Sequence, residues 1–458
     1  MFTAELLARN LLSVTRADLS PSTIGNARRC LLDLFGAAAS GFHTPPAEAL
    51  RRLASRRAGE SRLWFSPHTA CPESAAMANS AAASALDLDD GHRWAGGHPG
   101  AAVIPAALAV GEEEGRSLGD VLTAITVGYE AAVRVAAARD FPKLYALSTG
   151  RWSAYGVVAA AAWLRDVKPE QLAQALVIAG ELSPWLVGSG FSQFMGNHVK
   201  EGIPWSTHLG LMALDMACAG ITGPLDLFDN LEHYDHDKIT KEFAAAWRID
   251  GVYFKPYACC RWIHTALDAL SSLMHLTRLT GAEIDRIEVH TVRRALTLNN
   301  HPQPSSLESA QYSFPFCLAL LACDGPRSLL LLCQDHLGRR DVTELAVKVQ
   351  LVVDPELDNR FPAQCPAMVI VHARGEIYSM QVDVPQGDPG QPLSNLALAR
   401  KFLLLTRHSI AGGVAKEICR SFLTMDENLP VAKLLDSVPF FKVSDGMKQL
   451  NVYGGDHD

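Results

Sequence analysis

Two hydrophobic periodicities divide the chain. Up to about residue 250, apolar positions recur at helical spacing, and prolines or capping residues stand at the start of the apolar segments. Pro21, Pro72 and Pro169 each open such a segment, and Ser117 with Asp120 forms a capping-box variant before a long apolar run. The pattern predicts a helical region, and its many alanines favour close packing of helix against helix.

Further along the chain the period changes to two. Apolar and polar residues alternate over 345–353, which is the pattern of a half-buried strand. Residues 366–385 predict two strands that meet at Arg374–Gly375, and residues 285–292 predict another. Helical spacing returns after about residue 394.

This order predicts a mainly α protein with an α+β second domain. A chain of 458 residues exceeds one ordinary core, so two domains are expected. We expect residues 1–265 together with 395–458 to form a large all-helical domain, and residues 266–394 to form a smaller α+β lid inserted in it. A pocket at the seam between them is the expected site.

Composition narrows the possible partners. A hydrophobic share of 48% and a charged share of 20% are typical of a packed globular protein. The net charge of −8 argues against nucleic acid or an anionic membrane as a partner, so a small anionic substrate needs a local cationic pocket. The N-terminus lacks a signal-peptide pattern, and no apolar stretch reaches the roughly 20 residues of a membrane span. We expect a soluble cytoplasmic protein.

The densest polar cluster lies between two small-residue helices. It contains Asp87, Asp89, Asp90, His92 and His98, with two glycines before the last histidine and a proline after it. These groups could bind a divalent metal, or the carboxylates could hold an imidazole in one tautomer. Helix-capping aspartates and solvated histidines are the ordinary alternative.

Two further clusters precede apolar helices. Tyr145, Arg151 and Trp152 come before an alanine-rich helix, whose N-terminus would favour an anion. Lys200 stands between two apolar segments, where a desolvated lysine could act as a base or pair with a carboxylate. A packed phenol and surface cations are the ordinary alternative for these residues.

The fourth cluster lies where we expect the domain seam. Lys255, Arg261 and His264 occur within ten residues and would suit a second carboxylate of a substrate. The ten cysteines form no disulfide or zinc framework. The sequence has no phosphate-binding loop, dinucleotide fingerprint, nucleophile elbow or HExxH motif.

Six segments, taken in order, carry a family resemblance. They are ALDLDDGH with HPGAAVIPAALAVGE, VGYEAAVRV, VKPEQLAQALVIAGELSPWL, GITGPLDLF, YFKPYACCRWIH and AQYSFPFCLALLACDG. Over about residues 10–440 the chain resembles the 2-methylcitrate dehydratase (MmgE/PrpD) family. The resemblance implies a helical domain with an α+β lid, a homodimer, and chemistry without a cofactor or metal. His98, Asp87, Lys200 and Lys255 match family positions.

Three positions depart from the family pattern. Trp152 stands where the dehydratase and decarboxylase members typically carry a histidine, Phe316 where they tend to have a tyrosine, and Gly91 where threonine is common. Within the family, this pattern looks most like iminodisuccinate epimerase, which implies Tyr145 and Lys200 as opposing bases.

We therefore expect a cofactor-independent epimerase that inverts the α-carbon of iminodisuccinate, a small polycarboxylate, by two-base proton transfer. Cations must then lie where charge develops on the planar intermediate. The expected catalytic residues are Tyr145, Lys200 and His98, and the expected substrate-binding residues are Asp87, Arg151, Trp152, Lys255, Arg261 and His264.

Three alternatives stay open from the sequence. The nearest is a dehydratase of a 2-methylcitrate-like hydroxy tricarboxylic acid that uses His98 and Lys200. A metal-dependent lyase or hydrolase could be built on the acidic cluster from Asp87 to His92. A catalytically silent binding protein is the third, because Trp152 and Phe316 replace reactive groups.

Overall fold

The structure is a computed structural model that describes residues 1–140, 143–144, 146–184 and 197–441. The helices of the first part are α1 (Thr3–Leu12), α2 (Pro21–Gly41), α3 (Pro45–Ala54), α4 (Pro72–Ser84), α5 (Gly100–Glu113), α6 (Leu118–Ala138), α7 (Ser153–Leu164), α8 (Pro169–Leu182), α9 (Ile203–Cys218) and α10 (His236–Thr240). Those that follow are α11 (His264–Thr277), α12 (Leu307–Ala310), α13 (Phe314–Asp324), α14 (Pro326–Leu330), α15 (Arg340–Ala346), α16 (Pro355–Asp358), α17 (Asn395–Leu405), α18 (Gly412–Thr424) and α19 (Val431–Leu435). The strands are β1 (Ser61–Arg62), β2 (Thr69–Ala70), β3 (Gly91–His92), β4 (Val252–Tyr253), β5 (Ile284–Thr291), β6 (Val349–Val353), β7 (Ala367–Ala373) and β8 (Glu376–Val382).

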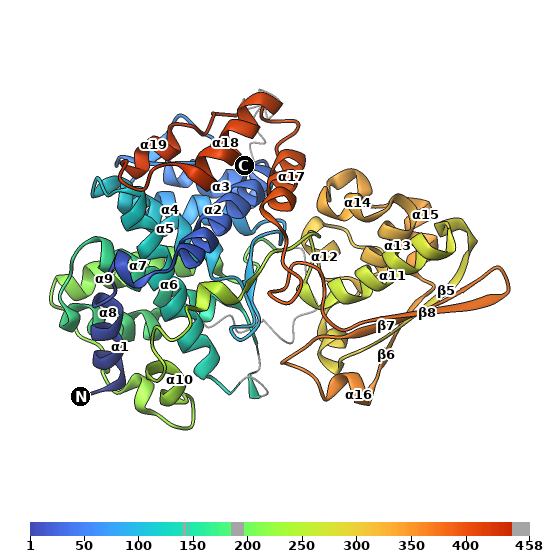
Figure 1. Cartoon of the computed structure of the whole chain (residues 1–458), viewed down its shortest axis with the longest axis horizontal. Coiled ribbons are helices and arrows are strands. Elements are labelled where there is room, and N and C mark those ends of the chain that lie inside the picture. The colour runs from blue at the N-terminus through green and yellow to red at the C-terminus, as the bar shows by residue number, and fades with distance from the viewer. Residues whose placement is uncertain (141–142, 145, 185–196, 442–458) are drawn as a thin grey trace, which may run out of the picture.

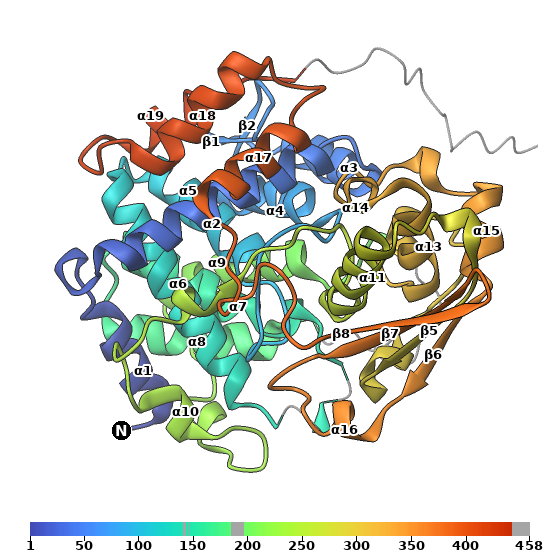
Figure 2. The ribbon, with the colours of Figure 1, turned by 45° about the vertical axis from the view of Figure 1, so that its right-hand side comes forward.

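The fold is mainly helical, as the sequence predicts. Helices α1–α10 and α17–α19 gather in one body, and α11–α16 accompany a four-stranded sheet beside it (Figure 1). The C-terminal helices return to the body, where α17 packs on α2 (Figure 2). Two large apolar clusters follow this arrangement, one within the helical body and one around α11, α13 and the sheet. The predicted domain boundaries and the role of the smaller unit as a lid stay predictions.

Local capping explains where the predicted helices begin. Ser20 precedes Pro21, and its hydroxyl accepts a hydrogen bond from the Thr23 amide at 3.1 Å. Ser117 and Asp120 cap α6 reciprocally, each side chain accepting from the other residue's amide at 3.1 Å. These side chains satisfy amides that the first helical turn leaves without partners.

The sheet has the order β6-β5-β7-β8, in which β5 and β6 are parallel and the other pairs are antiparallel. The predicted hairpin is present, and Arg374 and Gly375 at its tip have φ values of 57° and 72°. Two consecutive residues with positive φ match the turn that suits the twist of a hairpin. The predicted strand over 285–292 is also present as β5.

One predicted strand is too long at its start. Residues 345–353 alternate as a strand, but β6 begins only at Val349, and Leu345 lies in α15. In α15 the buried residues are Val342, Leu345 and Ala346, spaced three and four apart as on one helix face. Short apolar runs do not distinguish the two periods.

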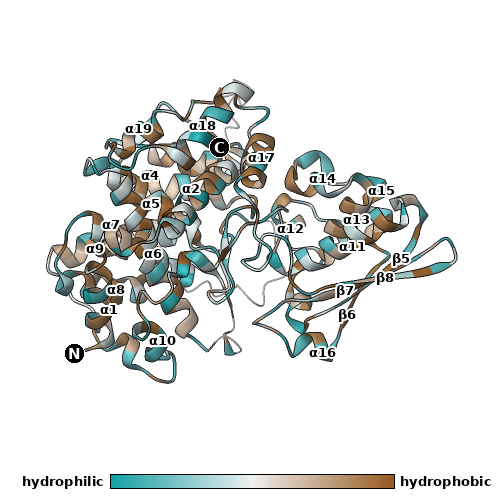
Figure 3. Cartoon of the chain, viewed as in Figure 1, coloured by the Kyte–Doolittle hydropathy of each residue, from teal (hydrophilic) through white to brown (hydrophobic). Residues whose placement is uncertain are grey.

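Helix α6 lies in the core of the helical body. By length and composition it could cross a membrane, but 94% of its most apolar window is buried by the rest of the protein. Apolar residues run along the helices around it (Figure 3). We therefore interpret α6 as a core helix.

Small residues let α6 and α7 approach closely. A Cβ atom on Gly156 would lie 2.6 Å from the Gly128 carbonyl oxygen, and one on Gly128 would lie 2.8 Å from the Gly156 oxygen. These contacts are with backbone, which cannot move away as a side chain could. The alanine-rich composition thus corresponds to backbone-to-backbone packing.

We predict that Gly156→Ala lowers the free energy of unfolding by about 1–3 kcal/mol, because the added methyl overpacks the α6–α7 contact. Gly25→Ala is the matched control, since a Cβ atom there meets nothing within 4 Å and alanine favours a helix. Urea denaturation measures both. Equal midpoints for the two variants would contradict this packing.

Candidate active site

The Asp87 carboxylate is the centre of the site. It is 1% exposed and follows the C-terminal end of α4. The Lys255 ammonium donates to its Oδ2 at 2.8 Å, and the Lys200 ammonium donates to its Oδ1 at 3.2 Å. Three distant segments of the chain are therefore joined at one buried carboxylate.

Both lysines are held by further acceptors. The Lys200 Nζ atom donates to the Ser84 carbonyl oxygen at 2.5 Å, and the Lys255 Nζ atom donates to the Asp87 carbonyl oxygen at 3.1 Å. The Lys255 side chain is 0% exposed, whereas the Lys200 side chain is 11% exposed. Of the two cations, Lys200 is therefore the one that a small molecule can reach.

Charge pairing outweighs burial at this cluster. Burial acts to raise the pKa of Asp87, but Lys200, Lys255 and His98 hold it far below its usual range. Burial acts to lower the pKa of Lys255, but the Asp87 charge keeps it above its usual value. Carboxylate and ammonium are thus both charged at neutral pH.

Two of these residues have unusual backbone conformations. Asp87 has φ of 54° and Lys200 has φ of 48°, both in the left-handed region. Such a conformation costs on the order of 1–3 kcal/mol for a residue other than glycine and is concentrated at functional sites. Here the left-handed conformation directs the Asp87 and Lys200 side chains toward each other, and the ion pair between them stabilises both conformations.

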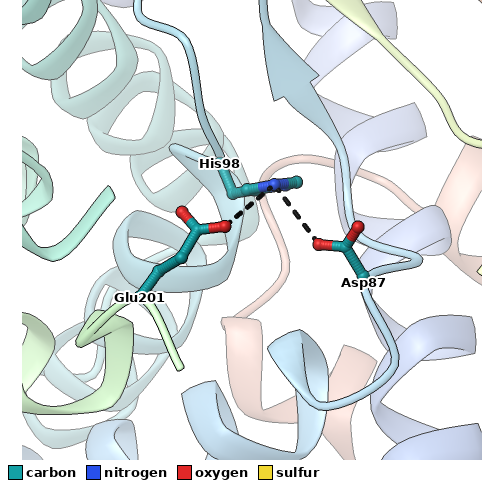
Figure 4. A group of neighbouring side chains, drawn as sticks. All are labelled: Asp87, His98 and Glu201. Carbon is teal, nitrogen blue, oxygen red and sulfur yellow. Dashed lines mark ion pairs between the residues drawn. The ribbon is translucent and has the colours of Figure 1, made fainter. Parts of the chain in front are cut away.

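The His98 ring is oriented by a backbone acceptor. Its Nδ1 atom lies 2.8 Å from the Asp90 carbonyl oxygen, so Nδ1 carries the proton. The Nε2 atom then faces Asp87 Oδ1 at 3.5 Å and Glu201 Oε1 at 3.9 Å (Figure 4). In the neutral ring, Nε2 is the nitrogen that can accept a proton.

Glu201 forms the opposite side of the site. The Thr149 hydroxyl donates to its Oε2 at 2.6 Å, and the Tyr312 hydroxyl donates to its Oε1 at 3.3 Å. Burial acts to raise the pKa of Glu201, but His98 is foremost among the groups that bring it below its usual value. Tyr312 comes from the segment between α12 and α13, so the smaller unit contributes a phenol to this site.

Sequence reasoning missed Glu201, Thr149 and Tyr312. Glu201 follows Lys200 directly, and that adjacency was the available signal. Tyr312 lies four residues before Phe316, the position at which a phenol was expected and is absent. The pairing of Thr149 with Glu201 depends on chain segments too far apart for any local pattern to show.

The described residues do not fit a divalent metal well. Ligand atoms of Asp87, His98 and Glu201 lie within 4.8 Å of one another. However, both oxygens of Asp87 already bind ammonium groups, whose charge would repel a cation. The alternative of a metal centre on the acidic stretch also used Asp89, Asp90 and His92, and none of these three is part of this group.

The rest of the acidic stretch serves to support the site. The Asp90 carboxylate accepts from the Tyr129 hydroxyl at 2.5 Å and from the Gly100 amide at 3.1 Å. Burial raises the pKa of Asp90 to about 7. Burial lowers the pKa of His92 to about 3, so this ring is neutral.

Arg261 and His264 are part of a buried network at the seam. Arg261 pairs with Asp388 at 2.5 Å and donates to the Gln386 carbonyl oxygen at 3.0 Å, and its Nη1 atom lies 2.9 Å from His264 Nδ1. Arg93 also pairs with Asp388. Arg261 thus holds the 385–391 loop and His264 lies against Arg261, and the predicted role of both in substrate binding stays a prediction.

The remaining predicted residues are Trp152, Arg151 and Tyr145. Trp152 is 0% exposed, and within the described chain its indole N–H has no hydrogen-bond partner. Arg151 is half-buried, and Tyr234 and Tyr155 are among its electrostatic neighbours. Tyr145, the predicted second base, lies outside the described residues.

Comparison with known proteins agrees with this architecture. Residues 5–234 match the MmgE/PrpD N-terminal domain, and residues 257–424 match the MmgE/PrpD C-terminal domain. The chain belongs to the MmgE/PrpD family. The two matches together cover most of this family member, and the segment 235–256 between them contains β4 and Lys255.

Several curated relatives of this MmgE/PrpD protein share one name. Cis-aconitate decarboxylase of Aspergillus terreus is 24% identical over 461 residues, covering 92% of each chain. The enzyme of that name from Mus musculus is 25% identical, covering 90% of this chain and 87% of its own. The one from Homo sapiens is 26% identical, covering 84% of this chain and 83% of its own. Iminodisuccinate epimerase, the sequence-based preference, is not supported by these relatives.

We predict that Asp90 makes stability depend on pH. The folded state keeps a proton on this carboxyl up to about pH 7, whereas an unfolded aspartate loses it near about pH 4. Its contribution to stability is therefore complete below about pH 4 and is lost as the pH rises to about 7.

Asp90→Asn removes this titration. Between pH 4 and 7, wild type should lose roughly 1–4 kcal/mol of unfolding free energy relative to the variant, and nothing further above pH 8. Denaturant titrations at each pH measure the difference. A difference that stays constant from pH 4 to 8 would refute the role assigned to Asp90.

Proposed function

We propose that this chain is a cofactor-independent lyase that acts on a tricarboxylic acid of the aconitate or citrate type. The names of its relatives support the substrate class. The observation that carries the proposal is the approach of His98 Nε2 and Lys200 Nζ to the same Asp87 oxygen, at 3.5 and 3.2 Å. A proton acceptor and a proton donor thus share one small space.

Decarboxylation and dehydration both require a site that stabilises negative charge beside a carboxylate. In decarboxylation the bond to the leaving carbon dioxide breaks, its electron pair stays on carbon, and a proton is added there. In dehydration a base takes a proton from carbon, and hydroxide leaves with a proton from an acid. Both routes place negative charge beside a carboxylate, and a preorganised cation stabilises it.

We assign the acid to Lys200 and the base to His98. Lys200 pairs with Asp87 and is partly exposed, so it can donate a proton and bind a carboxylate. His98 has its Nδ1 proton fixed on the Asp90 carbonyl, which leaves Nε2 to accept. Lys255 is fully buried and stabilises Asp87 instead of touching substrate.

Epimerisation of iminodisuccinate is the second candidate. It is favoured by the buried Trp152 and Phe316, which supply neither the imidazole nor the phenol expected of a lyase at those positions. Tyr312 supplies a phenol from a neighbouring position, which supports the lyase. The epimerase also depends on Tyr145 as a base, a role without structural support in the described residues.

Proton NMR in heavy water separates these functions. Purified protein is incubated with cis-aconitate, 2-methylcitrate and iminodisuccinate in turn. We expect a new alkene or decarboxylated product from one of the first two acids. Exchange of the α-proton of iminodisuccinate without any alkene would establish the epimerase instead.

We predict that His98→Asn and Lys200→Ala each lower kcat/KM by about 10²–10⁴-fold, because each removes one proton-transfer group. Lys416→Ala, at an exposed position of α18, is the control and should keep wild-type activity. Steady-state kinetics on the acid identified by NMR measure the effect. Wild-type rates in both site variants would disprove the assignment.

We predict that EDTA leaves the activity unchanged, since two ammonium groups occupy the carboxylate that a metal would need. The assay compares rates before and after prolonged chelation. Loss of activity that zinc or magnesium restores would show that the site is a metal centre.

A further inference from the structure

Gly91 and Tyr253 face each other across the short ladder of β3 and β4. They are direct partners in the antiparallel register. A Cβ atom on Gly91 would lie 2.4 Å from both Cζ and the hydroxyl oxygen of Tyr253. The phenol tip therefore occupies the space that any side chain at position 91 would need.

The Tyr253 ring is fixed in this place. It is 5% exposed, and the Arg261 guanidinium carbon lies 4.6 Å from its centroid. Arg261 is itself held by Asp388 at 2.5 Å. A stacked cation on one ring face and a glycine at its tip leave the phenol little freedom.

The Tyr253 phenol interacts electrostatically with the charged groups of the site. Lys255 follows two residues later and interacts with it, and Asp87 lies four residues before Gly91. Burial raises the pKa of Tyr253, so the hydroxyl is a proton-bearing donor at neutral pH. Within the described chain no hydrogen bond engages this hydroxyl, and its oxygen is not among the fully enclosed polar atoms.

A donor at the end of an otherwise buried ring requires a partner, and a phenol usually finds one. We propose that Tyr253 is a substrate-binding residue that donates a hydrogen bond to a carboxylate oxygen of the tricarboxylic acid, beside Lys255. This proposal rests on the proposed function for the identity of its ligand. Gly91 is then glycine because the specificity-determining side chain comes from the opposite strand.

The first test is Tyr253→Phe, which keeps the ring and removes only the donor. A hydrogen bond to a charged group is worth about 1.5–3 kcal/mol, so kcat/KM should fall about 10–100-fold, mainly through KM. The thermal midpoint should stay unchanged, because no described residue uses the hydroxyl. Tyr378→Phe, on β8, is the matched control and should behave as wild type. Wild-type KM in Tyr253→Phe would overturn the proposal.

A second pair of variants tests the geometry without relying on turnover. Gly91→Ala should lower the thermal midpoint, since its methyl meets the phenol at 2.4 Å. In Gly91→Ala/Tyr253→Val the midpoint should fall by less than the sum of the two single changes, because valine leaves room for the methyl, and tricarboxylate binding should stay weak. If Gly91→Ala alone is as stable as wild type, the two positions do not share this space and the proposal fails.

Binding of tricarballylate, an unreactive tricarboxylate, separates this proposal from the proposed function. Calorimetry should show about 10–100-fold weaker binding to Tyr253→Phe than to wild type. If wild type binds tricarballylate but turns over no tricarboxylic acid, the lyase fails while Tyr253 keeps its role. If wild type turns over a tricarboxylic acid but Tyr253→Phe binds tricarballylate as tightly as wild type does, the Tyr253 proposal fails while the lyase stands.

Discussion

The buried ion pairs of Asp87 are the interaction on which the site depends. One carboxylate at the end of α4 holds Lys200 and Lys255, which come from segments more than one hundred residues away. Burying an ion is costly, and removing one partner of such a pair leaves an uncompensated charge. The cluster is therefore stable only when all three segments are in place, so assembly of the site and completion of the fold are the same event.

The groups around the Asp87 ion pairs orient a histidine that can transfer a proton. Asp90 fixes the tautomer of His98 through its carbonyl oxygen and keeps its own side chain on Tyr129. Glu201 and Tyr312 close the other side. Charges of both signs are thus balanced in a small volume, and Glu201 adds a second carboxylate to the cations and Asp87 that the sequence predicts. In our account, Lys200 is the group by which that balance meets an anionic substrate.

The sequence predicts much of the fold because its signals are local. Caps at Ser20 and Ser117 place helices, and Arg374–Gly375 places the hairpin. The strand predicted to begin at Leu345 starts later, since a short apolar run fits both periods.

The site is less predictable because its pairings are long-range. The structure brings together Asp87, His98, Lys200 and Lys255, although their catalytic roles stay predictions. Arg261 holds the 385–391 loop and His264 lies against Arg261, while their substrate-binding role stays a prediction. Tyr312 reaches Glu201 from the segment before α13, a placement that no motif encodes.

The most direct test of the central claim is kcat/KM of Asp87→Asn on a tricarboxylic acid, measured on protein shown to unfold cooperatively. We predict a loss of at least about 100-fold, because Lys200 and Lys255 lose the carboxylate charge with which both are paired. Wild-type turnover in this variant would contradict it.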